Sequence, residues 1–87
     1  MSHYADVYNN ICAAKFDLQD YAGAIVDCSM AIKIDSNHAN AYNNLANSKF
    51  ALGDRGGACV DWNKAASLGI ETTAQWLQTE SGVWCGY

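Results

Sequence analysis

Apolar positions along this 87-residue chain recur every three or four residues, in blocks separated by short polar stretches. The first block has Tyr8, Ile11, Cys12 and Phe16 at this spacing, which places their side chains on one face of a helix. The chain contains no proline, so no proline ring breaks a helix within these blocks. The pattern predicts an all-α protein with helices at about 5–17, 21–34, 39–51 and 55–68.

The blocks are related by an internal repeat. The segment VYNNICAAKFDLQD (7–20) returns as AYNNLANSKFALGD (41–54), and residues 5–38 align with residues 39–72 throughout. The identical pairs include Tyr8/Tyr42, Lys15/Lys49, Asp20/Asp54 and Asp27/Asp61. A fixed period of this length indicates stacked helical units, because each unit buries its apolar face against its neighbour.

A third copy begins and then stops. Trp76 follows Tyr42 at the repeat interval, and Thr72 with Gln75 fits a capping box at the start of a short helix. Thr79 stands where the earlier copies have an apolar residue, which is typical of a terminal cap. The sequence therefore predicts one domain over 1–87, made of repeat 1 (5–38), repeat 2 (39–72) and a capping helix with an apolar tail (73–87).

These repeats resemble the tetratricopeptide repeat (TPR) family, whose 34-residue pattern is W-x2-L-G-x2-Y, then A-x3-F, then a further Ala and a Pro. The matching residues are Tyr8, Ile11, Cys12, Ala24, Cys28 and Ala31, then Tyr42, Leu45, Ala46, Ala58, Trp62 and Ala65. The prolines are missing, and Lys15 and Lys49 replace a Tyr, with Phe16 and Phe50 beside them to supply its bulk.

The resemblance implies a right-handed superhelical stack of two antiparallel helical hairpins, an α-α solenoid, with a fifth capping helix. The segment ACVDWNKAASLG (58–69) is also similar to the closing repeat of bacterial, especially cyanobacterial, arrays, which implies a bacterial or phage source.

Family members bind peptides on a concave face formed largely by the first helix of each pair. The residues that the resemblance places on this groove are Asp6, Asn9, Asn10, Ala13, Phe16, Asp17, Asn40, Asn43, Asn44, Asn47, Phe50 and Ala51. An Asn amide both donates and accepts, so it can pair with a peptide backbone whatever the peptide's side chains. The alternative is that these asparagines are solvated or form hydrogen bonds within and between the helices.

A narrower family mode holds a chaperone's C-terminal carboxylate with basic and Asn side chains. Of the positions it requires, Asn44 alone matches, and one Asn cannot supply the charge-assisted bonds that a carboxylate needs. We therefore do not expect chaperone-tail binding.

Charge and hydropathy exclude other partners. The net charge is -4 and the five basic residues are scattered, so no nucleic acid is expected. No apolar run is long enough to span a membrane, and the start lacks the features of a signal peptide. We expect a cytoplasmic protein.

The polar and cysteine chemistry does not indicate an enzyme. Cys12, Cys28, Cys59 and Cys85 show no metal-ligand spacing, and without a secreted context we expect them to be small buried apolar residues rather than disulfide, metal or redox sites. The role of Cys85 is the least defined of the four. No metal, cofactor or catalytic residue is predicted.

Three further features have ordinary structural interpretations. Asp27 and Asp61 recur on one helix face, which we expect to be exposed. His38 is expected in a turn. Gly56-Gly57 is expected to be a close contact between helices rather than a phosphate-binding loop.

Two functional hypotheses follow. The first is a non-enzymatic protein-protein interaction module or scaffold, which binds a peptide or partner helix in the Asn-rich groove. The second is a structural protein that self-associates as a homodimer or larger homo-oligomer, through the groove or the apolar tail around Val83, Trp84 and Tyr87.

Overall fold

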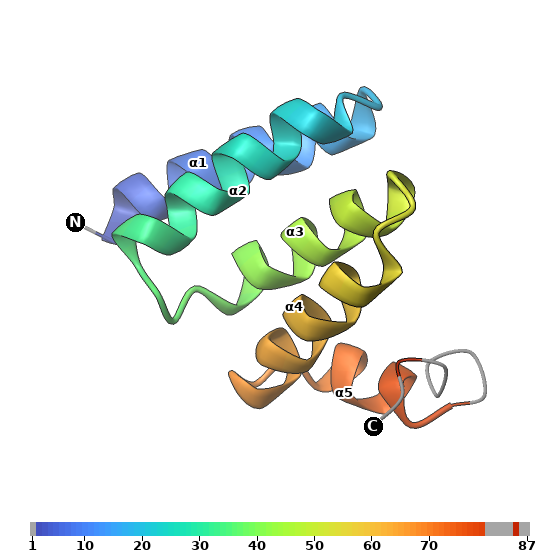
Figure 1. Ribbon diagram of the computed structural model, residues 1–87. Helices are drawn as coiled ribbons and strands as arrows, with labels where there is room; N and C mark the ends of the chain where they lie inside the picture. Colours follow the sequence, from blue (N-terminus) through green and yellow to red (C-terminus); the bar gives the residue numbers. More distant parts are fainter. Residues whose placement is uncertain (1, 80–84, 86–87) are drawn as a thin grey trace.

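The computed structural model describes residues 2–79 and residue 85, and these residues are all-helical apart from their connections. Figure 1 shows the helices in chain order. Their bounds are α1 (Ser2–Asp17), α2 (Tyr21–Ile34), α3 (Ala39–Ala51), α4 (Arg55–Ser67) and α5 (Glu71–Leu77). The predicted positions of all five helices are confirmed. The start of α1 lies three residues before its predicted position, α4 ends one residue earlier than predicted, and α5 begins two residues before the predicted residue 73.

Consecutive helices pack against each other. The first hairpin is formed by α1 and α2 and the second by α3 and α4, each joined by three residues (Figure 1). α3 packs against both α2 and α1, and α5 packs against α4. The second hairpin therefore lies between the first hairpin and α5.

The two turns inside the hairpins use the same chemistry. Asp20 and Asp54 are N-caps, and their side chains accept hydrogen bonds from the backbone N–H of Gly23 and Gly57 at 3.0 and 2.9 Å. A Cβ atom at either glycine would collide with the capping carboxylate. The expectation that Gly57 makes a close contact between helices is wrong, because its small size serves the cap of its own helix.

The residue before each capping aspartate has a positive φ. Gly53 has φ 89° and the equivalent Gln19 has φ 64°. The left-handed conformation ends α1 and α3 in the same way, although only the second repeat has the glycine that adopts it without strain.

α3 and α5 begin differently from these two helices. His38 is the N-cap of α3, where its Nδ1 accepts from the Ala41 N–H at 3.1 Å and its Nε2 lies 2.7 Å from Asp6 Oδ1. The N-cap of α5 is Ile70, which makes no side-chain capping bond. The capping box predicted at Thr72 is wrong, because the helix starts one residue before Thr72 and includes it.

Small side chains allow the helices to approach closely. Three clusters of buried side chains form the core, and six alanines contribute fully buried side chains to these clusters: Ala5, Ala24, Ala31, Ala41, Ala46 and Ala58.

The cysteines form two disulfides. Cys12 on α1 is bonded to Cys28 on α2, and Cys59 on α4 is bonded to Cys85. The expectation of unpaired, apolar cysteines is therefore wrong. The repeat explains the first bond, because the two positions that fill the space between the helices of a hairpin both hold Cys in repeat 1.

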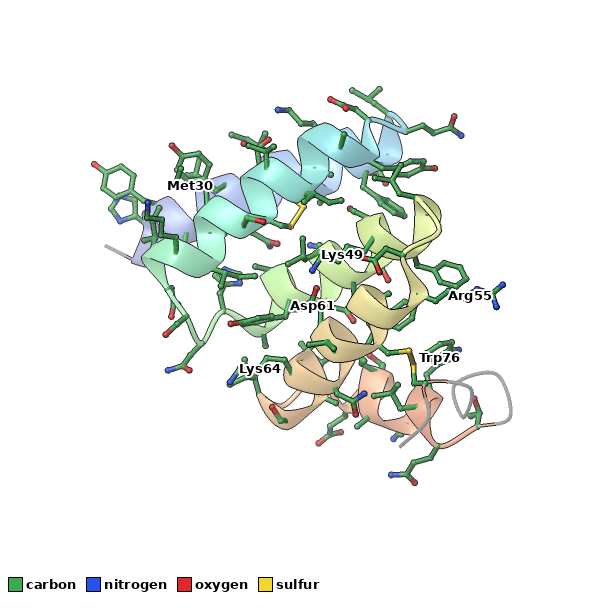
Figure 2. The ribbon with its side chains drawn as sticks, in the orientation of Figure 1. Met30, Lys49, Arg55, Asp61, Lys64 and Trp76 are labelled. Atoms are coloured by element: carbon green, nitrogen blue, oxygen red, sulfur yellow. A yellow bond between two sulfur atoms is a disulfide. The ribbon has the colours of Figure 1, made fainter. Side chains whose placement is uncertain are left out.

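An ion pair occurs at the same place in each hairpin. Lys15 Nζ lies 2.7 Å from Asp27 Oδ2, and Lys49 Nζ lies 2.7 Å from Asp61 Oδ2; Figure 2 labels Lys49 and Asp61. The hydrogen bond to Asp27 raises the pKa of Lys15 above its ordinary value. The prediction that both aspartates are exposed is wrong: their side chains are 13% and 9% exposed. The lysine that replaces Tyr in the TPR pattern thus has an anionic partner on the second helix.

Candidate functional site

A pocket of about 250 Å³ opens at the junction of the second hairpin and α5. Its lining comes from α3, α4 and α5, and consists of Asn43, Asn47, Trp62, Thr72, Thr73 and Trp76. None of these side chains is charged, so the pocket combines aromatic surface with amide and hydroxyl groups.

Two tryptophans form the apolar part of the pocket. The ring centroids of Trp62 and Trp76 are 4.9 Å apart with the planes tilted by 59°, and the ring centroid of Phe50 is 5.6 Å from that of Trp62. Trp62 is buried against Ala46 and Ala58, and Trp76, Leu77 and Cys85 pack on the same cluster. Trp76, labelled in Figure 2, projects from α5 near the second disulfide. The rings are therefore held by the core and present only part of their surface to the pocket.

The orientation of the Asn47 amide is fixed by Trp62. The indole Nε1–H donates to Asn47 Oδ1 at 3.1 Å. Because an indole nitrogen can only donate, the oxygen of the Asn47 amide must face the ring. The NH₂ group of Asn47 makes no hydrogen bond to any described residue, so its two donors are available to a ligand.

Asn43 is held in a similar way from the other side of the pocket. The Thr73 hydroxyl donates to Asn43 Oδ1 at 2.7 Å, which joins α5 to α3. The NH₂ group of Asn43 has no hydrogen-bond partner within residues 2–79. Asn43 and Asn47 are one helical turn apart on α3, so their free donors lie on the same side of the helix.

Asn9 and Asn44, also predicted for the groove, bond to each other. Asn44 Nδ2 donates to Asn9 Oδ1 at 2.9 Å, which links α3 to α1, and Asn9 is buried. These two amides therefore serve the packing between hairpins, which is the alternative stated above for the groove asparagines.

The other predicted groove residues do not line the pocket. Phe16 packs against the core and its ring meets Tyr21 edge-on, Ala13 is half-buried, and Phe50 is exposed beside Trp62. Ala51 is exposed. The remaining polar members of the predicted set are also exposed: Asp6, Asn10, Asp17 and Asn40. The pocket thus includes Asn43 and Asn47 from the predicted set.

Four lining residues were not predicted: Trp62, Thr72, Thr73 and Trp76. The repeat does place Trp76 in phase with Tyr8 and Tyr42, but the groove positions of the repeat correspond to Ala74 and Leu77 on α5 and to Gln78, its C-cap. The groove pattern therefore does not indicate Trp76 or Thr73. Trp62 matches the repeat pattern, but no pattern indicated that its N–H would reach Asn47.

The described residues contain neither a cluster of metal-binding side chains nor a helix that could cross a membrane. No group of three or more His, Cys, Asp and Glu residues within them could hold a metal ion. None of their helices has the length and apolar character needed to cross a membrane.

No protein-family model matches the chain, and no significant match was found among curated proteins or solved structures.

Proposed function

We propose that this chain is a non-enzymatic, TPR-like interaction module that binds an extended peptide in the pocket formed by the second hairpin and α5. The 34-residue repeat, the paired hairpins and the in-phase fifth helix support this assignment. The same features support a right-handed solenoid arrangement, in which α1, α3 and α5 line one concave face.

The observation that carries the proposal is the pair of oriented amides beside two tryptophans. Asn47 and Asn43 use their oxygens inside the protein, through Trp62 and Thr73, and keep N–H donors for a ligand. Peptide carbonyl oxygens are the matching acceptors, and the faces of the rings can pack against one side chain of the peptide.

The dimensions and charge restrict the ligand. A pocket of about 250 Å³ is smaller than the ~300–1,000 Å³ of ordinary small-molecule sites, so it fits one or two residues of a longer peptide. The net charge of -4 favours a neutral or basic peptide over an acidic one. The part of a Trp ring that reaches the pocket can also hold a Lys or Arg side chain by a cation–π contact.

The test begins with selection of peptides from a random display library on the oxidised, wild-type chain. Asn47→Asp keeps the oxygen that accepts from Trp62 and removes the NH₂ donors, so it separates ligand binding from folding. We expect Asn43→Asp and Asn47→Asp each to weaken binding of the selected peptide by roughly tenfold, the effect of about 1.4 kcal/mol.

Asn40→Asp is the matched control. It adds the same charge to the same helix at an exposed position outside the pocket, and binding should stay within about twofold of wild type. The proposal fails if all three variants bind equally, or if Asn40→Asp weakens binding as much as the pocket variants do.

The disulfides are evidence about the cellular compartment in which the chain functions. Disulfides persist in oxidising compartments and are rare in the cytosol, so the pairing of all four cysteines weighs against the expected cytoplasmic location. We propose that the module works in an oxidising compartment. Blocking free thiols during lysis of the native host, followed by mass spectrometry, would show whether the bonds exist there, and reduced cysteines would refute this placement.

A further inference from the structure

The outer side of α1 carries a stripe of apolar residues that the described part of the chain leaves exposed. The α1 stripe is Tyr4, Val7, Ile11 and Ala14, at the alternating spacing of three and four residues by which one helix packs along another. Tyr4, Val7 and Ile11 are 54%, 49% and 39% exposed, and Ala14 is also exposed.

The internal repeat shows what these positions do when they have a partner. Their equivalents are His38, the N-cap of α3, and three residues on α3: Ala41, Leu45 and Ser48. Ala41 packs against Ala31 of α2, Leu45 packs against Ala24 and Cys28 of α2, and Ser48 is fully buried. The α1 stripe is therefore the same docking surface that α3 uses against the first hairpin.

The side chains of the stripe are complementary to a second copy of themselves. Val7 and Ile11 are equidistant from position 9, and so are Tyr4 and Ala14. When two copies of α1 pack antiparallel around that point, Val7 meets Ile11 of the other copy, and the large Tyr4 meets the small Ala14. Pairing of large with small side chains is what close helix packing requires.

Electrostatic repulsion between the two stripes does not oppose this pairing. None of its four residues is charged, and Lys15 beside it is directed to Asp27 of its own chain. In Figure 2, Met30 on α2 lies on the side of the first hairpin that faces away from α3 and α4, and it is 38% exposed.

We propose that two copies of this chain form a two-fold symmetric dimer through antiparallel packing of the α1 stripe. The surface is on the first hairpin and the pocket involves the second hairpin and α5, so the dimer leaves both pockets open. The proposal does not depend on the proposed function, and it differs from association through the groove or the tail.

Sedimentation equilibrium of the oxidised full-length chain tests the dimer. We expect the wild type to dimerise, and Val7→Glu and Ile11→Lys each to raise the dimer dissociation constant at least roughly tenfold. An equimolar mixture of the two variants should recover a one-to-one dimer, because Glu at position 7 of one copy then faces Lys at position 11 of the other while the second Val7–Ile11 contact is unchanged.

Val26→Glu is the matched control. Val26 is 64% exposed and its repeat equivalent, Val60, is also exposed at 58%, so the repeat assigns it no docking role. Circular dichroism checks that each variant is helical. The proposal is overturned if the wild type is a monomer, if Val26→Glu disrupts association as strongly as the stripe variants do, or if the mixture of folded variants does not associate.

Discussion

The two hairpins use one pair of repeat positions to hold their helices together, but with different chemistry. In the first hairpin these positions are Cys12 and Cys28, which form a disulfide. In the second they are Ala46 and Trp62, which pack in one buried cluster. A cystine fills this space and closes it covalently, whereas an indole fills it and keeps an N–H group at its edge.

That difference explains why the pocket is built on the second repeat. The Trp62 N–H orients Asn47, and the equivalent of Asn47 in the first repeat is Ala13, which has no polar group to orient. Likewise, Asn9 is hydrogen-bonded to Asn44. The repeat equivalent of Asn9 is Asn43, which is hydrogen-bonded to Thr73 instead. The repeat equivalent of Asn44 is Gln78, which is exposed. A few substitutions in a repeated frame therefore convert a packing interface into a candidate binding site.

The largest expected effect is the loss of Trp62. Trp62→Ala removes the side chain that holds the second hairpin together and should lower the free energy of unfolding by about 3–5 kcal/mol. Urea denaturation followed by circular dichroism measures this change. Trp62→Phe is the control: it keeps an aromatic ring and loses the bond to Asn47, which should cost much less. An equal loss in both variants would mean that the ring is not what closes this hairpin.

The disulfide of the first hairpin is expected to contribute somewhat less than the indole. It joins residues separated by 16 positions, and a closed loop of that length stabilises by about 3 kcal/mol through the unfolded state. We expect Cys12→Ala/Cys28→Ala to lower the free energy of unfolding by about that amount, measured in urea, with peptide binding unchanged in the folded fraction. A loss of binding in folded protein would contradict the assignment of the site to the second hairpin.

The repeated ion pairs should give the next effect. Lys49→Met leaves the buried carboxylate of Asp61 without its partner, and we expect it to lower the free energy of unfolding by about 2 kcal/mol. This loss is smaller than that for a fully buried pair because Lys49 is partly exposed. Adding Asp61→Leu should recover most of it. Lys15→Met should cost less, since both partners of that pair are more exposed. If the double variant is less stable than Lys49→Met, the ion pair is not the source of the loss.

These contacts show what the sequence could and could not predict. The 3.6-residue pattern and the repeat located α2 and α3 to the residue, because helix ends here coincide with Asp caps and polar loops. The burial of Asp61 was not predictable from its residue type. A carboxylate can be buried only with a partner, and here Lys49 reaches it from another helix. Similarly, Cys12 and Cys28 are 16 residues apart, and only their joint position between packed helices shows that they can bond.

The candidate site was predicted only in part, for the same reason. Asn43 and Asn47 follow from the groove positions of the repeat, but whether an amide is free or engaged depends on its neighbours. Asn44 is hydrogen-bonded to Asn9. Because Asn9 and Asn43 have the same local sequence, that sequence does not show which amide will be engaged by a neighbouring helix. The tail residues 80–84, 86 and 87, to which the sequence assigned a self-association role, lie outside the described residues.

The smallest expected effect concerns the turn in each hairpin. Gln19 has φ 64° where the second repeat has Gly53, and a non-glycine residue is strained in this region. Gln19→Gly should raise the free energy of unfolding by up to about 1 kcal/mol, because relief of strain exceeds the entropic cost of glycine. Gly53→Gln should lower it by a similar amount. Thermal denaturation of the two variants checks the opposite signs, and a change of the same sign in both would contradict this account of the turns.

The most direct measurement of the proposed binding mode is a ¹⁵N-correlation NMR titration of the oxidised chain with a peptide selected on it. The side-chain NH₂ signals of Asn43 and Asn47 and the indole N–H signals of Trp62 and Trp76 should shift with peptide concentration, while the NH₂ signals of Asn10 and Asn40 stay in place. Shifts confined to the signals of Asn10, Asn40 or the first hairpin, with the four pocket residues unchanged, would contradict the account.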